Sequence, residues 1–210
     1  MEAALASEEK KRQTFAEKMR FWFRWLLDPV AAFLSRLGLR PNTVTMAGLI
    51  GTIACAALIA SGHMTWAGLL LLVMGPVDAL DGALARFRGE ASDWGAFVDS
   101  VTDRYSELFI FFGFVMYYLG QENPVGVILA YLAAAGSVLV SYVKARADAS
   151  RLDANVGLLT RVERYLVMIP LLIFNQPLAL LIIIAIFANF TALQRIWRVR
   201  RDAHRRYTQS

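Results

Sequence analysis

Four aspartates stand in two pairs within stretches that are otherwise strongly apolar. Asp78 and Asp81 are three residues apart and Asp99 and Asp103 are four apart, so each pair shares one face of a helix. Ionised carboxylates near bilayer depth are costly unless they are paired, and four close together also repel one another. Divalent cations resolve both problems, and oxygen ligands favour Mg²⁺ or Mn²⁺. The array predicts a catalytic metal site with ligands for two ions.

The residues around the aspartates suit phosphoryl transfer. Two cations can bridge a diphosphate and neutralise charge on the group in transfer. Gly82, Ala85 and Gly95 are small enough to let a nucleotide approach the backbone, and Arg86 can reach a phosphate. Among the carboxylates, Asp103 is our candidate for the base that accepts the proton of an attacking hydroxyl. Any one of these residues could be a packing contact, but the whole array favours a metal-dependent active site.

The composition indicates a polytopic membrane protein. Of the 210 residues, 57% are hydrophobic, which is too many for a soluble domain of this length. The histidines at 63 and 204 are far from the aspartates, which argues against zinc, and the single Cys55 excludes an intrachain disulfide. The net charge of +5 is explained by membrane topology, so we expect no nucleic-acid partner.

The predicted fold class is an all-α integral membrane protein. Residues 1–40 carry apolar side chains at helical spacing between basic ones, which predicts amphipathic helices in the membrane interface, broken near Asp28-Pro29. Residues 41–200 form the transmembrane catalytic domain, and residues 201–210 form a basic tail. The six expected spans are 42–62, 65–88, 94–119, 124–146, 161–175 and 177–198.

The distribution of basic residues predicts the orientation. The connections at 61–65, 120–124 and 175–177 are short and contain no Lys or Arg, so they lie outside the cytoplasm. Both termini, the 87–93 loop and the 147–160 loop are then cytoplasmic. The four aspartates fall near the cytoplasmic ends of the second and third spans. We therefore expect a multi-pass cell-membrane protein with a cytoplasmic active site.

The complete pattern resembles the signature of the CDP-alcohol phosphatidyltransferase family. It reads Asp78-x2-Asp81-Gly82-x2-Ala85-Arg86-x8-Gly95-x3-Asp99-x3-Asp103, with no departure at any signature position. The resemblance implies transfer of a phosphatidyl or similar group from a CDP-linked donor, such as CDP-diacylglycerol, to an alcohol, with release of CMP. It also implies a homodimer surrounded by membrane lipids.

The resemblance further implies roles for individual residues. Asp78, Asp81 and Asp99 would bind metal, and Asp103 would be both the base and a ligand of the second ion. Residues that would contact the CDP group are Asn42, Asp78, Gly82, Ala85, Arg86, Ser92 and Gly95, where Pro41-Asn42 is similar to the family's motif at the start of the first span.

A second basic group gathers at the same membrane side. We expect Lys144, Arg161, Arg164 and Arg195 to bind the phosphate of a phosphorylated acceptor. The alternative is positive-inside anchoring, which we favour for Arg198 and the arginines that follow it.

Local sequence around these cations is similar to the phosphatidylinositol-phosphate synthase branch. The matching segments are Asp99-Ser-Val-Thr-Asp103-Arg104, Tyr142-Val-Lys144-Ala-Arg146-Ala, Thr160-Arg161-Val-Glu163-Arg164 and Gln194-Arg195. The resemblance implies inositol 1-phosphate as the acceptor. The loop after Arg86 is less glycine-rich than that branch, so phosphatidylglycerophosphate synthase or another CDP-alcohol phosphotransferase stays open as an alternative.

Two further alternative functions follow from the sequence. A small ion- or proton-coupled transporter could use the aspartates as a relay, but no repeat is visible and the carboxylates lie toward one membrane end. An inactive family member acting as a scaffold is disfavoured by the intact aspartate set. Glu107, one turn beyond Asp103, is expected to form a structural ion pair with Arg104 or to sit in a polar network behind the site.

Overall fold

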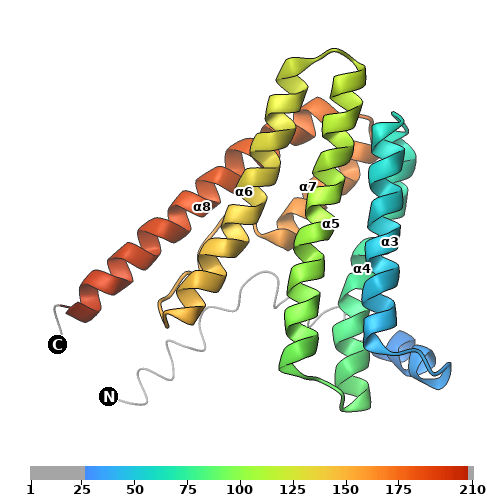
Figure 1. The fold of residues 1–210 in the computed structure, drawn as a ribbon, viewed down its shortest axis with the longest axis vertical. Coiled ribbons are helices and arrows are strands. Elements are labelled where there is room, and N and C mark those ends of the chain that lie inside the picture. The colour runs from blue at the N-terminus through green and yellow to red at the C-terminus, as the bar shows by residue number, and fades with distance from the viewer. Residues whose placement is uncertain (1–26, 208–210) are drawn as a thin grey trace.

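The computed structural model describes residues 27–207, and these residues form helices connected by short loops, with no strand. A helix over residues 27–36 precedes six longer ones (Figure 1). The six are α3 (Pro41–Ala60), α4 (Met64–Arg88), α5 (Asp93–Gly120), α6 (Pro124–Ala149), α7 (Arg161–Ile173) and α8 (Pro177–Tyr207). The predicted interfacial segment falls largely on residues outside the described range, so only its end is seen as a helix.

The helix boundaries follow from local capping chemistry. Proline begins α3, α6 and α8, where a missing backbone N–H costs nothing. The Ser92 hydroxyl accepts a hydrogen bond from the Gly95 N–H at 3.1 Å and caps α5, and the Asn123 side chain accepts from the Gly126 N–H at 3.0 Å and caps α6. Gly89 ends α4 in the left-handed conformation (φ 67°), which glycine adopts readily. Tight turns of this kind make successive helices antiparallel.

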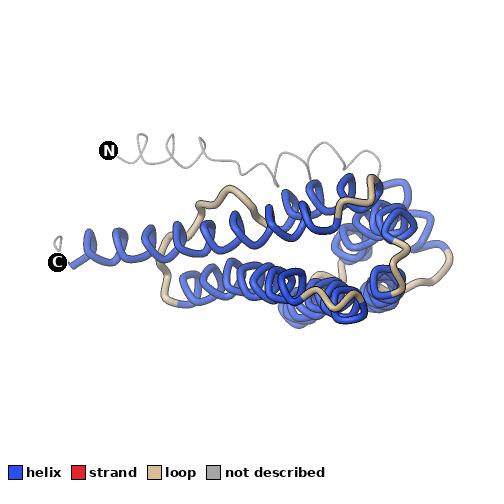
Figure 2. The backbone as a smooth tube through the Cα atoms, turned by 90° about the horizontal axis from the view of Figure 1, so that it is seen from above, coloured by secondary structure: helices blue, strands red, loops and turns tan. Residues whose placement is uncertain are grey.

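The helices pack as a bundle with a continuous apolar core. α3 packs against both α4 and α5, α6 packs against α5 and α8, and α7 packs against α4 and α8. Fully buried core side chains come from every one of these helices, among them Ile59, Leu71, Phe114 and Leu172. Figure 2 shows the bundle from above, with the final helix running out past the others to the C-terminus.

Four helices in the described range are long and apolar enough to cross a membrane: α3, α4, α6 and α8. α5 is longer than a typical span, but it carries the acidic residues of the predicted site. α7 has 13 residues and is therefore only about 20 Å long. The basic tail predicted at 201–210 begins as a direct continuation of α8, which ends at Tyr207.

Gly113 lies where the backbones of α3 and α5 approach closely. A Cβ atom at this position would lie 2.6 Å from the carbonyl oxygen of Ala56, closer than any real contact allows. We expect Gly113→Ala to destabilise the protein by about 1–3 kcal/mol because the two backbones must separate. Gly120→Ala on the same helix is the matched control, since a Cβ there would meet no described atom within 4 Å. Thermal unfolding in detergent should show a lower midpoint for the first variant alone, and equal midpoints would contradict the close contact.

Candidate active site

The Asp81 side chain, on α4, is held by a hydroxyl group from the neighbouring helix α3. This side chain is buried, and its Oδ2 accepts a hydrogen bond from Thr45 Oγ1 on α3 at 2.7 Å. Gly82 N–H contacts the other oxygen of the same carboxylate. Sequence analysis missed Thr45. The available signal was a hydroxyl side chain three residues after Asn42, in the first turns of a predominantly apolar helix. The bond fixes the start of α3 against the predicted metal and nucleotide residues.

Asp103 lies at the junction of α5 and α7. Asp103 is 7% exposed, and its Oδ2 forms an ion pair with Arg161, the first residue of α7. Arg104 Nη2 approaches the same oxygen at 3.4 Å. The Arg161 guanidinium also lies over the Tyr165 ring, 5.6 Å from its centroid, which limits its freedom. A residue predicted to bind the acceptor's phosphate is thus in contact with the residue predicted to be the base.

A second ion pair lies one turn deeper on the same two helices. Arg164 donates to Glu107 through Nε (2.9 Å) and Nη2, and both side chains are almost completely buried. Its third guanidinium nitrogen, Nη1, donates a hydrogen bond to the carbonyl of Leu159 at 3.2 Å. The prediction that Glu107 pairs with Arg104 is wrong, because α7 supplies a cation that can meet the buried carboxylate with two donors. The expectation of a structural ion pair for Glu107 is confirmed, with Arg164 in place of Arg104 as the partner.

The remaining metal candidates are distributed along α4 and α5. Asp99 is half-buried one turn before Asp103, and Asp78 lies one turn before Asp81 on α4. Among the side chains that the structure describes, which exclude Asp78, no three His, Cys, Asp or Glu gather closely enough to hold one ion. The donor chemistry nevertheless fits a hard cation. Asp81 and Asp103 are buried carboxylates, which positive charge stabilises, and Asp103 already pairs with a guanidinium.

Two of the predicted nucleotide residues, Gly82 and Gly95, have few close neighbours among the described residues. Among the described side chains, a Cβ at Gly82 would meet Arg86 Nη1 and a Cβ at Gly95 would meet Ser92 Oγ, each at 3.4 Å, and no other within 4 Å. The Arg86 side chain therefore lies over the backbone of Gly82. Further residues of this predicted set are Asn42, which is exposed at the start of α3, and Ala85, which is half-buried on α4. Their contact with a nucleotide stays a prediction.

The four predicted acceptor cations differ in accessibility. Arg161 and Lys144 are partly exposed, and Lys144 Nζ bonds Asn155 Oδ1 at 2.8 Å. Arg164 and Arg195 are buried, and Arg195 donates to the carbonyls of Val156 (2.9 Å) and Val140. Lys144 and Arg161 are thus better placed to meet a ligand from solution than the two buried arginines.

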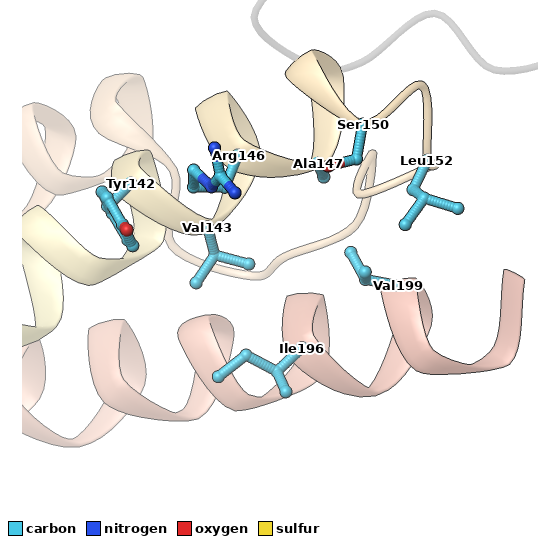
Figure 3. Close-up of a pocket in the computed structure, with 8 residues that line it drawn as sticks. All are labelled: Tyr142, Val143, Arg146, Ala147, Ser150, Leu152, Ile196 and Val199. Carbon is cyan, nitrogen blue, oxygen red and sulfur yellow. The ribbon is translucent and has the colours of Figure 1, made fainter. Parts of the chain in front are cut away.

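A small pocket lies apart from these residues, between α6 and α8. Its volume is about 210 Å³, and apolar side chains such as Val143, Leu152, Ile196 and Val199 dominate its wall (Figure 3). Arg146 is the charged residue among its lining residues. None of the predicted site residues lines it, so we do not assign it to the reaction.

Comparison with known proteins identifies the class. The family model for CDP-alcohol phosphatidyltransferase matches residues 39–194, which contain the four signature aspartates and three of the four predicted acceptor cations, while Arg195 lies one residue beyond the match. The chain therefore belongs to the CDP-alcohol phosphatidyltransferase family and is an enzyme of that class. Membership favours the enzyme over the transporter and scaffold alternatives.

Two individual relatives within this family show which of its members the chain is similar to. The chain is 35% identical over 201 residues to a phosphatidylinositol phosphate synthase of Streptomyces avermitilis, covering 88% of this chain and 82% of the relative. It is 31% identical over 176 residues to an archaetidylinositol phosphate synthase of Pyrococcus horikoshii, covering 83% and 91%.

Solved structures show the same fold. The phosphatidylinositol phosphate synthase of Mycobacterium tuberculosis with CDP-DAG bound superposes with a TM-score of 0.74 at 28% identity, covering 82% of this chain and 92% of that one. The same enzyme in complex with manganese and citrate also gives a TM-score of 0.74, at 30% identity, covering 82% and 88%.

Proposed function

We propose that this enzyme transfers a phosphatidyl group from CDP-diacylglycerol to inositol 1-phosphate and releases CMP. The observation that carries this proposal is the contact between Arg161 and Asp103. It places a cation suited to a phosphate beside the carboxylate suited to deprotonate a hydroxyl, as a phosphorylated alcohol requires. The bacterial and archaeal relatives support it, because their names differ in the lipid but share inositol phosphate.

The proposed mechanism is direct in-line transfer. Asp103 accepts the proton of the acceptor hydroxyl. At the same time the hydroxyl oxygen of the acceptor forms a bond to the phosphorus next to the lipid. The bond from that phosphorus to the CMP oxygen breaks, and CMP leaves. Asp78, Asp81, Asp99 and Asp103 would hold two Mg²⁺ or Mn²⁺ ions, which neutralise charge on the diphosphate when bound. Arg86 binds a donor phosphate, while Gly82 and Gly95 leave room for the nucleotide.

The acceptor pocket is proposed to form from cations of three helices. Lys144 and Arg161 contact the acceptor phosphate directly, and the buried Arg164 and Arg195 add positive potential behind them. In this arrangement the phosphate enters from the cytoplasmic side, where it stays solvated. The acyl chains of the donor remain in the bilayer and reach the site between helices.

The membrane arrangement that suits this reaction has six crossings, α3 to α8. Both termini and the site face the cytoplasm, since Lys and Arg are absent from the opposite connections. We also propose a homodimer, by resemblance to the family.

The direct test is CMP release by the purified protein with CDP-diacylglycerol and Mg²⁺. We would compare inositol 1-phosphate, glycerol 3-phosphate, free inositol and serine as acceptors, and we expect turnover with inositol 1-phosphate alone. Turnover with glycerol 3-phosphate instead would keep the reaction class and reject the acceptor. No CMP release with any of them would reject the proposal.

One substitution tests the pocket. We expect Lys144→Gln to raise the KM for inositol 1-phosphate about tenfold, equivalent to roughly 1.4 kcal/mol of binding, with kcat little changed. Arg146→Gln, two residues along the same helix, is the control because Arg146 is exposed and outside the predicted set. Equal KM values for the two variants would remove Lys144 from the pocket.

A further inference from the structure

The loop between α6 and α7, residues 150–160, connects all four predicted acceptor cations. Arg161 follows it directly in the chain. The other three donate hydrogen bonds to it: Lys144 Nζ to Asn155 Oδ1 (2.8 Å), Arg195 Nε to the Val156 carbonyl (2.9 Å) and Arg164 Nη1 to the Leu159 carbonyl (3.2 Å). The relative positions of these cations therefore depend on the conformation of this loop.

The first half of the loop is attached to the cytoplasmic end of α8 by acidic and basic side chains. Arg198 donates to Asp153 Oδ2 through Nε (3.0 Å) and Nη2 (2.6 Å). Asp202, one turn further along α8, accepts a hydrogen bond from the Asp153 backbone N–H at 3.1 Å. Asp153 is thus held through its side chain and its backbone. The Asp153 and Arg198 side chains are only 32% and 28% exposed, which strengthens the pair relative to one on an open surface.

The second half of the loop is fixed by a close backbone approach. The buried hydroxyl of Thr191 accepts a hydrogen bond from the Leu159 N–H at 3.1 Å. Gly157 has a φ of 143°, and a Cβ there would lie 2.5 Å from the methyl carbon of Thr191. This half therefore has little freedom of its own, whereas the Asp153 end is held mainly by hydrogen bonds to side chains of α8.

We propose that Asp153, Arg198 and Asp202 are positioning residues for the acceptor-phosphate cations. They hold the α6–α7 loop on α8, and the loop sets the positions of Lys144 and Arg161. Arg198 then acts as part of the enzyme's acceptor specificity and not as an anchor for lipid headgroups. A small misplacement of binding groups lowers the efficiency of a reaction strongly, so a remote pair of this kind is expected to affect acceptor binding. The inference rests on the proposed function, because it concerns the same acceptor pocket.

The experiment compares Asp153→Asn, Arg198→Met and the reversed pair Asp153→Arg with Arg198→Asp. In each single variant we expect the KM for inositol 1-phosphate to rise roughly three- to tenfold, because one charged hydrogen-bonded contact is lost. The KM for CDP-diacylglycerol should stay unchanged, and the reversed pair should recover most of the loss. The matched control is Arg201→Met, because Arg201 is an exposed arginine on the same helix.

Equal changes in both KM values, or no change in either, would overturn the proposal, as would a reversed pair no better than the singles. A second readout does not depend on turnover: calorimetric binding of inorganic phosphate to the enzyme should weaken in the single variants and not in Arg201→Met. Unchanged phosphate binding would also overturn the proposal. Failure of the proposed function would look different, because the unmodified enzyme would then release no CMP with inositol 1-phosphate.

Discussion

An Asp103→Asn enzyme is expected to release CMP roughly a thousandfold more slowly than the unmodified enzyme, within the range found for loss of a general base. The amide cannot accept the proton of the attacking hydroxyl, and it is a poorer ligand for a divalent cation. It also removes the charge that holds Arg161 at the end of α7. The measurement is CMP release at saturating CDP-diacylglycerol, inositol 1-phosphate and Mg²⁺.

The control for this variant is Asp93→Asn. Asp93 stands in the first turn of the same helix, is exposed and lies outside the signature. Its removal should leave turnover nearly unchanged, because a first-turn acid contributes only a small helix-dipole term. An Asp103→Asn enzyme that kept more than a tenth of the activity would show that another group accepts the proton, and would direct attention to Asp99.

The course of the chain could be predicted from its sequence because helix length and helix ends are local properties. Apolar runs of span length are separated by prolines, glycines and capping side chains, and several observed helix ends fall at such residues, among them Pro41, Gly89 and Ser92. The span predicted at residues 94–119, for example, is observed as the helix Asp93–Gly120, and the Ser92 cap marks its start. The largest difference is at α8, which continues nine residues beyond 198. The polar face of this last part of α8 contacts the α6–α7 loop. The length of the apolar run could not reveal that contact.

The sequence predicted which site residues share a face of one helix, but not which residues of different helices contact one another. Spacings of three and four residues place each aspartate pair on one face, which is information within a single element. The contacts of Thr45 with Asp81 and of Arg198 with Asp153 join residues that are 36 and 45 positions apart. Such pairs depend on how whole helices pack, and the sequence of either partner does not specify the other. Glu107 shows the same limit, since the local rule favoured Arg104 and the packed bundle supplied Arg164.

Breaking the buried pair between Glu107 and Arg164 is expected to give the largest loss of stability in the chain. Arg164→Met leaves the Glu107 carboxylate buried with no cation, and Glu107 Oε2 already has no hydrogen-bond partner among the described residues. Losing one member of a buried ion pair costs about 3–5 kcal/mol, so the single variant should unfold at a much lower temperature in detergent. Glu107→Leu alone should be destabilising for the same reason, with the positive charge left unpaired.

The double variant Glu107→Leu with Arg164→Met separates structure from function. Replacing both charges with apolar groups of similar size is often neutral, so most of the unfolding midpoint should return and the two effects should be far from additive. Additive losses would mean that the two side chains do not act as a pair. Activity of the recovered protein then tests Arg164 itself: a raised KM for inositol 1-phosphate supports its place in the acceptor pocket. An unchanged KM would assign the pair wholly to holding α7 against α5, leaving Arg161 and Lys144 to bind the phosphate.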